Sequence, residues 1–195
     1  VREVITTYVK KNIAHILINN TGGPPGGRAI DAHPESFVKA FSAHLLCNQI
    51  LVQALVPGMR KAGYGRVINV ISTSVKIPIP GLGVSNTIRG AVANWAKTLS
   101  LELGPDGITV NNVLPGATTT DRLEEILRQK AEKSGRSFDD VKEEMISEIP
   151  VGRLASPREV AAAAAFLVSG RASYVTGVAF PVDDYQTPRW QRCGV

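Results

Sequence analysis

Three side chains able to do chemistry are brought together by the spacing around Ser72. Ser72 directly follows an apolar run over residues 66–71, which is typical of a buried strand, so it stands at that strand's carboxyl end. After a Pro/Gly-rich bend, a helical pattern begins near Gly83 and places Ser85 and Arg89 one turn apart. Two hydroxyls and a guanidinium can bind an oxygen atom and stabilise negative charge that develops on it. Because ligands of open α/β sheets sit at the carboxyl ends of strands, we expect the functional site here.

Two further loops lie at strand ends and complete this edge. Residues 14–18 read as a strand covered on both faces, and they lead into a glycine-rich loop over residues 19–27. The strand predicted at residues 108–113 leads into a second glycine-containing loop over residues 114–121. Glycines let the backbone approach a ligand closely. The alternative for the first loop is a flexible surface connection without a ligand.

Helices are predicted between and after these strands. A helix tail is expected over 1–12, and a second helix starts at Pro34 and kinks or restarts at Pro57. A third helix is expected over 83–103, and two more lie within 121–147, split near Gly135. A capped helix over 157–169 precedes a last strand at 178–183. Alternating strands and helices indicate an α/β, Rossmann-like three-layer fold with a parallel sheet. The polar segment 121–150 is either a solvated helical pair or an inserted lid.

Composition narrows the function classes. The chain has 195 residues, which suits one domain, and its net charge of +5 comes from scattered basic residues without a basic run, so we expect no nucleic-acid partner. No apolar run approaches about 20 residues and the start is charged, so neither a membrane span nor a signal peptide is expected. Cys47, read as a small core residue, and Cys193 lack metal-ligand spacing. They indicate free thiols, a reducing cytoplasmic compartment and no metal site.

The strand-end motifs, taken in order, resemble the short-chain dehydrogenase/reductase family. ILINNTGG is similar to the family's Asn-Asn-Ala-Gly strand motif, GRVINVIS to the strand that carries the catalytic serine, and NNVLPGATTTDRL to the Pro-Gly loop that holds the nicotinamide half of the cofactor. The resemblance implies a single, partial NAD(P)-binding domain over residues 1–195. It lacks the family's amino-terminal β-α-β unit and the glycine-rich pyrophosphate loop of that unit. The resemblance assigns cofactor contacts to Asn20, Thr21, Gly22, Pro115, Gly116, Thr118 and Thr120.

The catalytic set departs from the family pattern at three positions. Ser72 matches the family's serine, but Ser85 stands where the tyrosine is expected, Arg89 where the lysine is expected, and His44 where a helix asparagine is usual. A lysine can lower the tyrosine pKa from about 10 towards neutrality, whereas a serine hydroxyl cannot be brought there by one cation. Water or His44, which has a suitable unperturbed pKa, would then handle the proton.

Two hypotheses follow from the resemblance. The first is an NAD(P)-dependent oxidoreductase, similar to 3-oxoacyl-carrier-protein reductases, that acts on a small carbonyl or alcohol substrate by hydride transfer. The second is a catalytically impaired protein of the same fold that binds a nucleotide or a partner protein. Family members commonly form dimers or tetramers, so a homo-oligomer is expected. The choice between NAD and NADP depends on family residues that these 195 do not include.

Overall fold

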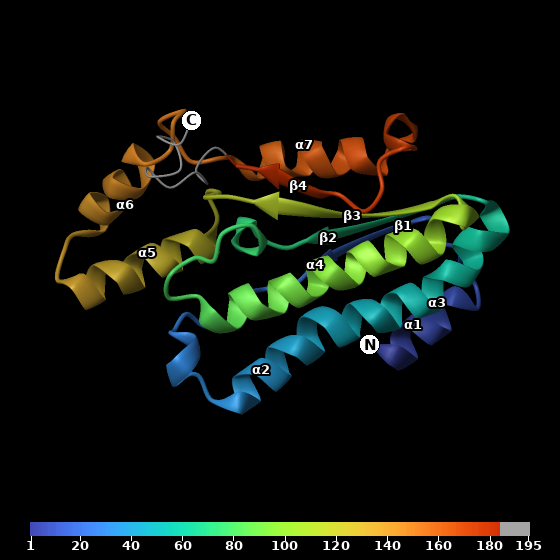
Figure 1. The fold of residues 1–195 in the computed structure, drawn as a ribbon, viewed down its shortest axis with the longest axis horizontal. Helices are drawn as coiled ribbons and strands as arrows, with labels where there is room; N and C mark the ends of the chain where they lie inside the picture. Colours follow the sequence, from blue (N-terminus) through green and yellow to red (C-terminus); the bar gives the residue numbers. More distant parts are fainter. Residues whose placement is uncertain (184–195) are drawn as a thin grey trace.

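A parallel β-sheet forms the centre of the protein. The computed structural model describes residues 1–183, and within them four strands pair in the order β1-β2-β3-β4, all parallel (Figure 1). The strands are β1 (Ile16–Asn20), β2 (Gly65–Val70), β3 (Ile108–Pro115) and β4 (Ala179–Val182). The expected α/β fold with a parallel sheet is confirmed.

Helices cover both faces of the sheet and extend from its carboxyl edge. They are α1 (Arg2–Val9), α2 (Pro34–Phe41), α3 (Cys47–Ala62), α4 (Gly83–Leu103), α5 (Asp121–Ser134), α6 (Phe138–Ser147) and α7 (Pro157–Val168). Helices α3 and α4 pack on one face, with α1 outside α3, and α7 packs on the other (Figure 1). Helices α5 and α6 lie beyond the arrowheads of the strands, so the polar segment stands at the edge where the site is expected.

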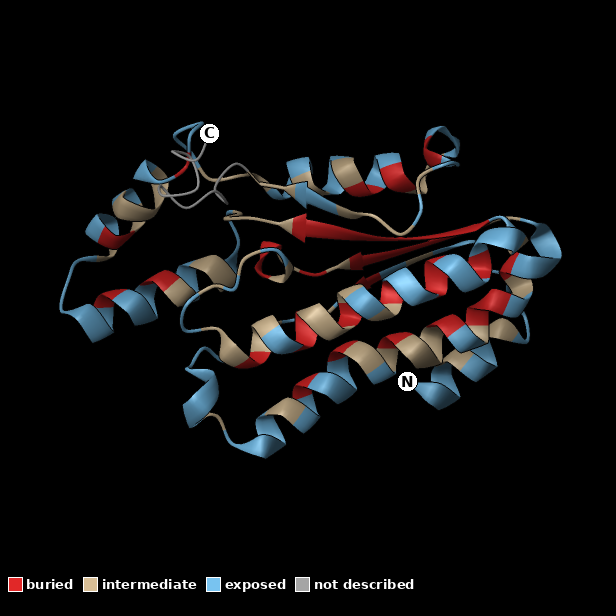
Figure 2. Cartoon of the chain, viewed as in Figure 1, coloured by how far each residue is buried: buried red, intermediate tan, exposed pale blue. Residues whose placement is uncertain are grey.

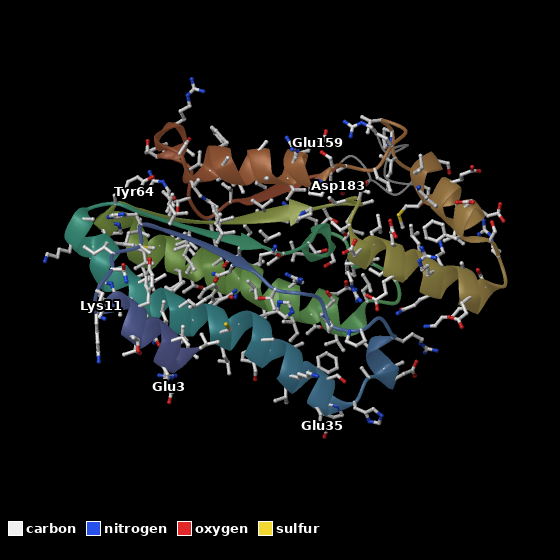
Figure 3. The ribbon with its side chains drawn as sticks, turned by 180° about the vertical axis from the view of Figure 1, so that it is seen from behind. Glu3, Lys11, Glu35, Tyr64, Glu159 and Asp183 are labelled. Carbon is white, nitrogen blue, oxygen red and sulfur yellow. The ribbon has the colours of Figure 1, made fainter. Side chains whose placement is uncertain are left out.

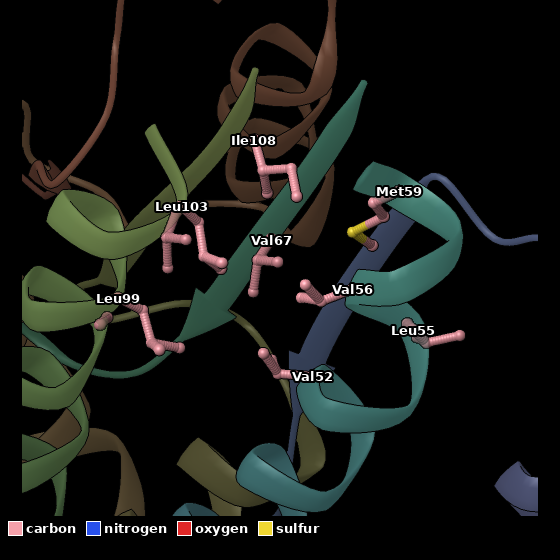
Figure 4. Close-up of a cluster of buried hydrophobic side chains, with 10 residues drawn as sticks. Val52, Leu55, Val56, Met59, Val67, Leu99, Leu103 and Ile108 are labelled. Atoms are coloured by element: carbon pink, nitrogen blue, oxygen red, sulfur yellow. The ribbon is translucent and has the colours of Figure 1, made fainter. Parts of the chain in front are cut away.

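The central strands are almost completely buried, which explains their apolar sequences (Figure 2). Between the sheet and the helices α3 and α4, Met59, Val67 and Ile108 have no exposed surface and pack in one cluster with Val56 and Leu103 (Figure 4). Each such side chain stabilises the fold by about 1.5–3 kcal/mol. This core fixes α4, and with it the positions of Ser85 and Arg89, relative to the strand ends.

A buried cation, Arg66, lies at the amino-terminal edge of the sheet, opposite the edge where the site is expected. The Arg66 guanidinium lies 4.2 Å from the centre of the Tyr64 ring and donates to the carbonyls of Gly65 and Gly107. The Tyr64 hydroxyl donates to the carbonyl of Val168 at the end of α7. Figure 3 shows Tyr64 at the far end of the sheet from Asp183. This cluster joins helix α7 to strand β2, away from the strand ends.

One sequence expectation about β1 is wrong for the described residues. Ile16 and Ile18 are 45% and 50% exposed, so only the face that carries Leu17 and Asn19 is covered. Helix α7 packs against β2, β3 and β4 and does not extend over this edge strand. The sequence predicted burial on both faces because the consecutive residues Ile16, Leu17 and Ile18 are all apolar, whichever face each occupies.

The expected restart of the helix at Pro57 is also wrong. Helix α3 continues through Pro57 to Ala62, and the irregular turn comes earlier, as a π-helical turn over Ser42–Leu46 between α2 and α3. A π-turn widens the helix by one residue and is often found at functional sites. Cys47, expected in the core, is half-buried just after this turn. Cys193 lies outside the described residues.

One helical stretch within the described residues, Pro34–Ala62, is long and apolar enough to cross a membrane by length and composition, with a mean hydropathy of 1.3. Core helices and amino-terminal signal sequences meet the same criterion. The hydropathy is that of an 18-residue window within this stretch, and 33% of the window is buried inside the protein. Polar residues interrupt the apolar run, so its sequence does not predict a membrane span. Helix α3 packs against β2 and α1, and these are the contacts of a core helix.

Candidate active site

Three buried asparagines join the strands just before their carboxyl ends. Asn19, Asn69 and Asn112 are partners in the parallel register of β1, β2 and β3. The Asn19 side chain donates to the Asn69 side chain at 2.9 Å, and the Asn69 side chain donates to that of Asn112 at 3.0 Å. All three are at least 95% buried, since their exposures are 5%, 0% and 3%. This ladder fixes the strand ends relative to one another, and the sequence analysis did not identify it.

Arg89 lies across the carboxyl ends of β1 and β2. Its guanidinium donates to the carbonyl of Val70 at 2.8 Å and to the carbonyl of Thr21 at 3.2 Å. The side chain is buried, and none of the ion pairs among the described residues includes it. Burial lowers the pKa of Arg89 to about 10, so the group remains a cation at neutral pH. Since a guanidinium has five N–H donors, Arg89 holds the two strand ends and keeps donors for a ligand.

His44 reaches the same place from the π-turn. It is 4% exposed and has a hydrogen bond with the backbone of Gly22. Burial, the largest cause, and the nearby Arg89 cation together lower the pKa of His44 to about 4, while the hydrogen bond to Gly22 opposes this shift. The imidazole is therefore neutral at neutral pH and a weak base, which counts against it as the proton carrier. The structure brings His44, Arg89, Thr21 and Gly22 together, with His44 as a support of the loop.

The low pKa of His44 predicts a pH-dependent stability. Between pH 6.5 and pH 4 the unfolded chain binds a proton at His44 that the folded protein does not, so stability falls as the pH falls. From pH 7 to pH 5 we expect His44 to contribute a loss of about 2 kcal/mol in the free energy of unfolding. Urea unfolding of the protein and of His44→Asn at both pH values measures this. The variant should lose about 2 kcal/mol less, and equal losses would contradict the assignment.

The two serines stand on the two elements that Arg89 joins, Ser72 just after β2 and Ser85 on α4. Ser72 follows β2 in extended conformation (φ −166°), and its hydroxyl oxygen accepts the backbone N–H of Ser74 at 3.1 Å. That bond uses a lone pair and leaves the Ser72 proton free to be donated. Ser85 is half-buried in the first turn of α4, four residues before Arg89. The expected convergence of the two serine hydroxyls and the cation at this strand edge stays a prediction.

The loop after β1 is held by the bend before α4. Gly27 donates its N–H to the carbonyl of Gly81 and accepts the N–H of Gly83, at 2.6 Å and 2.9 Å. A side chain at Gly83 would collide with the backbone of Ala29, so these segments approach as closely as glycine allows. These bonds tie the exposed residue Gly27 to the bend before α4, and the choice between a ligand loop and a flexible surface connection stays open. Of the assigned contacts on the first loop, Asn20 is exposed, on the opposite face of β1 from Asn19.

The second loop carries the other assigned cofactor contacts. Pro115 ends β3, and Gly116 packs so closely against Asp183 that a side chain at Gly116 would collide with it. The Thr118 hydroxyl donates to the carbonyl of Gly116 at 3.1 Å. The Thr120 hydroxyl oxygen accepts the N–H of Leu123 and so forms the N-cap of α5.

The lid candidate touches the first loop. Arg122, in the first turn of α5, donates to the carbonyl of Pro24 at 2.8 Å and pairs with Glu125. Helices α5 and α6 divide at Gly135, whose φ of 65° caps α5, as the sequence predicts. Segment 121–150 thus connects the two strand-end loops, a position suited to a lid, and its function as one stays a prediction. Among residues 1–183 no group of histidine, cysteine and acidic side chains could hold a metal ion.

The parallel sheet and the glycine loops at its strand ends are those of a short-chain dehydrogenase/reductase with a Rossmann-like fold. The family described as "Enoyl-(Acyl carrier protein) reductase" matches residues 2–184, and the chain belongs to this family.

Individual relatives agree with this assignment. The chain is 30% identical over 168 residues to the NADPH-dependent reductase BacG of Bacillus subtilis, and this covers 86% of the chain and 65% of BacG. The solved structure of YwfH, described as an NADPH-dependent reductase involved in bacilysin biosynthesis, superposes with a TM-score of 0.88 at 28% identity over 95% of the chain and 72% of YwfH. L-sorbose reductase from Gluconobacter frateurii, solved with NADPH and L-sorbose, gives 0.86 at 28% identity over 96% of the chain and 74% of that structure. The chain thus spans about 65% of the length of BacG.

The donors at the strand ends fit one part of a nicotinamide dinucleotide. Arg89 is a buried cation with N–H groups to spare, and the Ser72 proton is free. Both groups would bind hydroxyl or carbonyl oxygens, such as those of a ribose or a carboxamide. A pyrophosphate is usually held at a helix N-terminus after a glycine-rich turn, and none of the strand-to-helix turns in residues 1–183 has the Gly-x-x-x-Gly-x-Gly pattern. The described residues therefore fit the nicotinamide-ribose half.

Proposed function

We propose that the protein is an NAD(P)-dependent oxidoreductase that acts on the carbonyl or hydroxyl group of a small molecule. The observation that carries the proposal is the buried Arg89 cation at the carboxyl ends of β1 and β2, which donates to the carbonyl of Val70, two residues before Ser72, in the sheet of a short-chain dehydrogenase/reductase. The printed descriptions of BacG as an NADPH-dependent reductase and of L-sorbose reductase as an NADPH complex support NADP as the first cofactor to test.

The chain's own residues would bind and polarise the reacting oxygen. A bound nicotinamide supplies or accepts the hydride. Ser72 donates its proton in a hydrogen bond to the substrate oxygen, while the N–H of Ser74 bonds to the Ser72 oxygen and helps to orient the hydroxyl. Arg89 stabilises the negative charge that develops on this oxygen during reduction. Ser85 continues the hydrogen-bonded path, and water delivers the proton, since neither a serine hydroxyl nor neutral His44 is an effective acid near neutral pH.

The assembly and the compartment are part of the same proposal. A homo-oligomer, either a dimer or a tetramer, is supported by the oligomers that members of the family commonly form. Large apolar side chains on the surface, such as Phe41, Leu101 and Phe166, also support it. A cytoplasmic location is supported by the free thiol of Cys47. A monomeric mass by light scattering at micromolar concentration would contradict the oligomer.

A second function is supported by one observation, the joint replacement of the family's tyrosine and lysine by Ser85 and Arg89. Arg89 donates two hydrogen bonds to backbone carbonyls at the strand ends, as a cation with a structural role would. On this reading the protein binds a nucleotide or a partner protein and does not turn over a substrate.

One experiment separates the two functions. The intact protein is titrated with NADPH and NADH, followed by fluorescence, and then incubated with each cofactor and a panel of aldehydes and ketones while the absorbance of the reduced cofactor is recorded. Turnover of any carbonyl supports the oxidoreductase. Saturable binding without turnover supports the binding protein, and no binding of either cofactor would contradict both.

A further inference from the structure

A pocket that is separate from the candidate active-site residues lies on the α4 face of the sheet, next to the start of β4. Its volume is about 360 Å³. The walls come from the turn after Ser72, from α4, from β3 and from residues 177–179 at β4. None of its lining residues belongs to the set predicted for catalysis or for the cofactor. The polar side chains that line it are Lys76, Asn94, Lys97 and Asn112.

Asn112 presents an unpaired donor to this pocket. Its side-chain oxygen accepts the amide of Asn69 at the end of the asparagine ladder, and this bond fixes the orientation of the Asn112 amide. The residue is 97% buried, since only 3% of its surface is exposed. Its side-chain nitrogen makes no hydrogen bond within residues 1–183 and is not sealed from solvent, so it is open to the cavity that Asn112 lines. An amide donor in this position can bond either to water or to an acceptor atom of a ligand.

The two lysines add positive charge without any acid to neutralise it. No ion pair among the described residues includes Lys76 or Lys97, and no acidic residue lines the pocket. The Lys97 side chain lies across Gly177, where a Cβ atom would come within 2.8 Å of the Lys97 Nζ atom. Gly177 has a φ of +70° and leaves the room that this lysine occupies. The ammonium group of Lys97 is thus directed along the wall of the pocket by packing.

We propose that this pocket binds an oxyanion, the phosphate or carboxylate group of a small molecule, through Lys76, Lys97 and Asn112. The pocket is lined by two lysines and the Asn112 amide donor and by no carboxylate, and an oxyanion has acceptors for these three groups. The ladder from Asn112 through Asn69 to Asn19 ends two residues before Thr21, whose carbonyl binds Arg89. The oxyanion site is therefore linked by side-chain hydrogen bonds to the loop of the candidate active site.

The test is an NMR titration of the intact, ¹⁵N-labelled protein with inorganic phosphate and, separately, with malonate, at constant ionic strength set by sodium chloride. We expect saturable binding, with a shift of the Asn112 side-chain amide signal. Lys97→Gln should weaken binding by about tenfold or more, because a charged hydrogen bond is lost, and Lys76→Gln should act in the same direction. Both lysines are exposed, so neither variant should disturb the fold. Lys61→Gln, on the exposed end of α3, is the matched control and should leave the affinity unchanged.

Each outcome decides the proposal. Saturation with phosphate alone assigns a phosphate group, saturation with malonate alone assigns a carboxylate, and saturation with both supports the general oxyanion site. No saturable binding, an unmoved Asn112 amide signal, or equal affinity in the double variant Lys76→Gln/Lys97→Gln would overturn it. The proposal does not rest on the oxidoreductase activity. The affinity for NADPH should stay unchanged in Lys97→Gln, so failure of one proposal leaves the other standing.

Discussion

Replacing Ser85 by tyrosine and Arg89 by lysine together is expected to raise the turnover number for carbonyl reduction by about 10²-fold or more. General acid–base catalysis contributes about 10²–10⁴-fold, and the present pair lacks a group with a suitable pKa. A tyrosine beside a lysine can donate its proton near neutral pH, whereas serine and arginine cannot. Turnover is measured by NADPH oxidation with the most reactive carbonyl found for the unaltered protein.

Two single variants serve as controls for this gain. Ser85→Phe adds the ring without the hydroxyl and should not raise turnover. Arg89→Lys alone should lower the free energy of unfolding, because a lysine cannot reach both the Val70 and the Thr21 carbonyls with the geometry of a guanidinium. A double variant that is folded, binds NADPH and is no faster than Ser85→Phe would show that proton transfer does not limit this site.

Asn69→Leu is expected to lower the free energy of unfolding by about 3 kcal/mol. Asn69 is fully buried at the centre of the ladder, and leucine would leave the Asn19 amide and the Asn112 carbonyl oxygen unpaired. Each orphaned buried group costs about 1–3 kcal/mol. Urea unfolding followed by circular dichroism measures the change.

The matched control is the triple variant in which Asn19, Asn69 and Asn112 all become leucine. With no polar partner left unpaired, its loss should be smaller than the sum of the three single losses. An Asn69→Leu variant that loses less than about 0.5 kcal/mol, the size of a surface substitution, would contradict the ladder's role in holding the strand ends.

Most of the fold could be predicted because the sequence signals are local. The helix predicted over 83–103 is α4 with the same bounds, and the Ser156–Glu159 capping box begins α7 as expected. The apolar runs at 66–71 and 108–113 became β2 and β3, although β3 continues to Pro115. The exposed face of β1 was not predictable, because burial depends on which helices cover a strand.

The site was predicted less completely, because its main contacts join residues far apart in the chain. Nothing near Arg89 in sequence indicates that it would bind the carbonyls of Thr21 and Val70. The place of His44 on or near the apolar stripe of its helix does indicate burial, but the neighbouring Arg89 cation, which also lowers the His44 pKa, cannot be placed from the sequence. The asparagine ladder did leave a signal. Three apolar strands each contain an asparagine, and a buried amide must find a partner, so equal positions on neighbouring strands could have suggested the pairing.

The central claim, that this strand edge supports hydride transfer, is tested most directly by isotope transfer. The intact protein is incubated with NADPH that carries deuterium at the transferred position and with the carbonyl panel, and the alcohols formed are analysed by mass spectrometry. We predict deuterium on the carbinol carbon of at least one product, and loss of this label in Ser72→Ala. NADPH that binds but transfers no deuterium to any of the carbonyls would contradict the claim and leave the binding protein as the function.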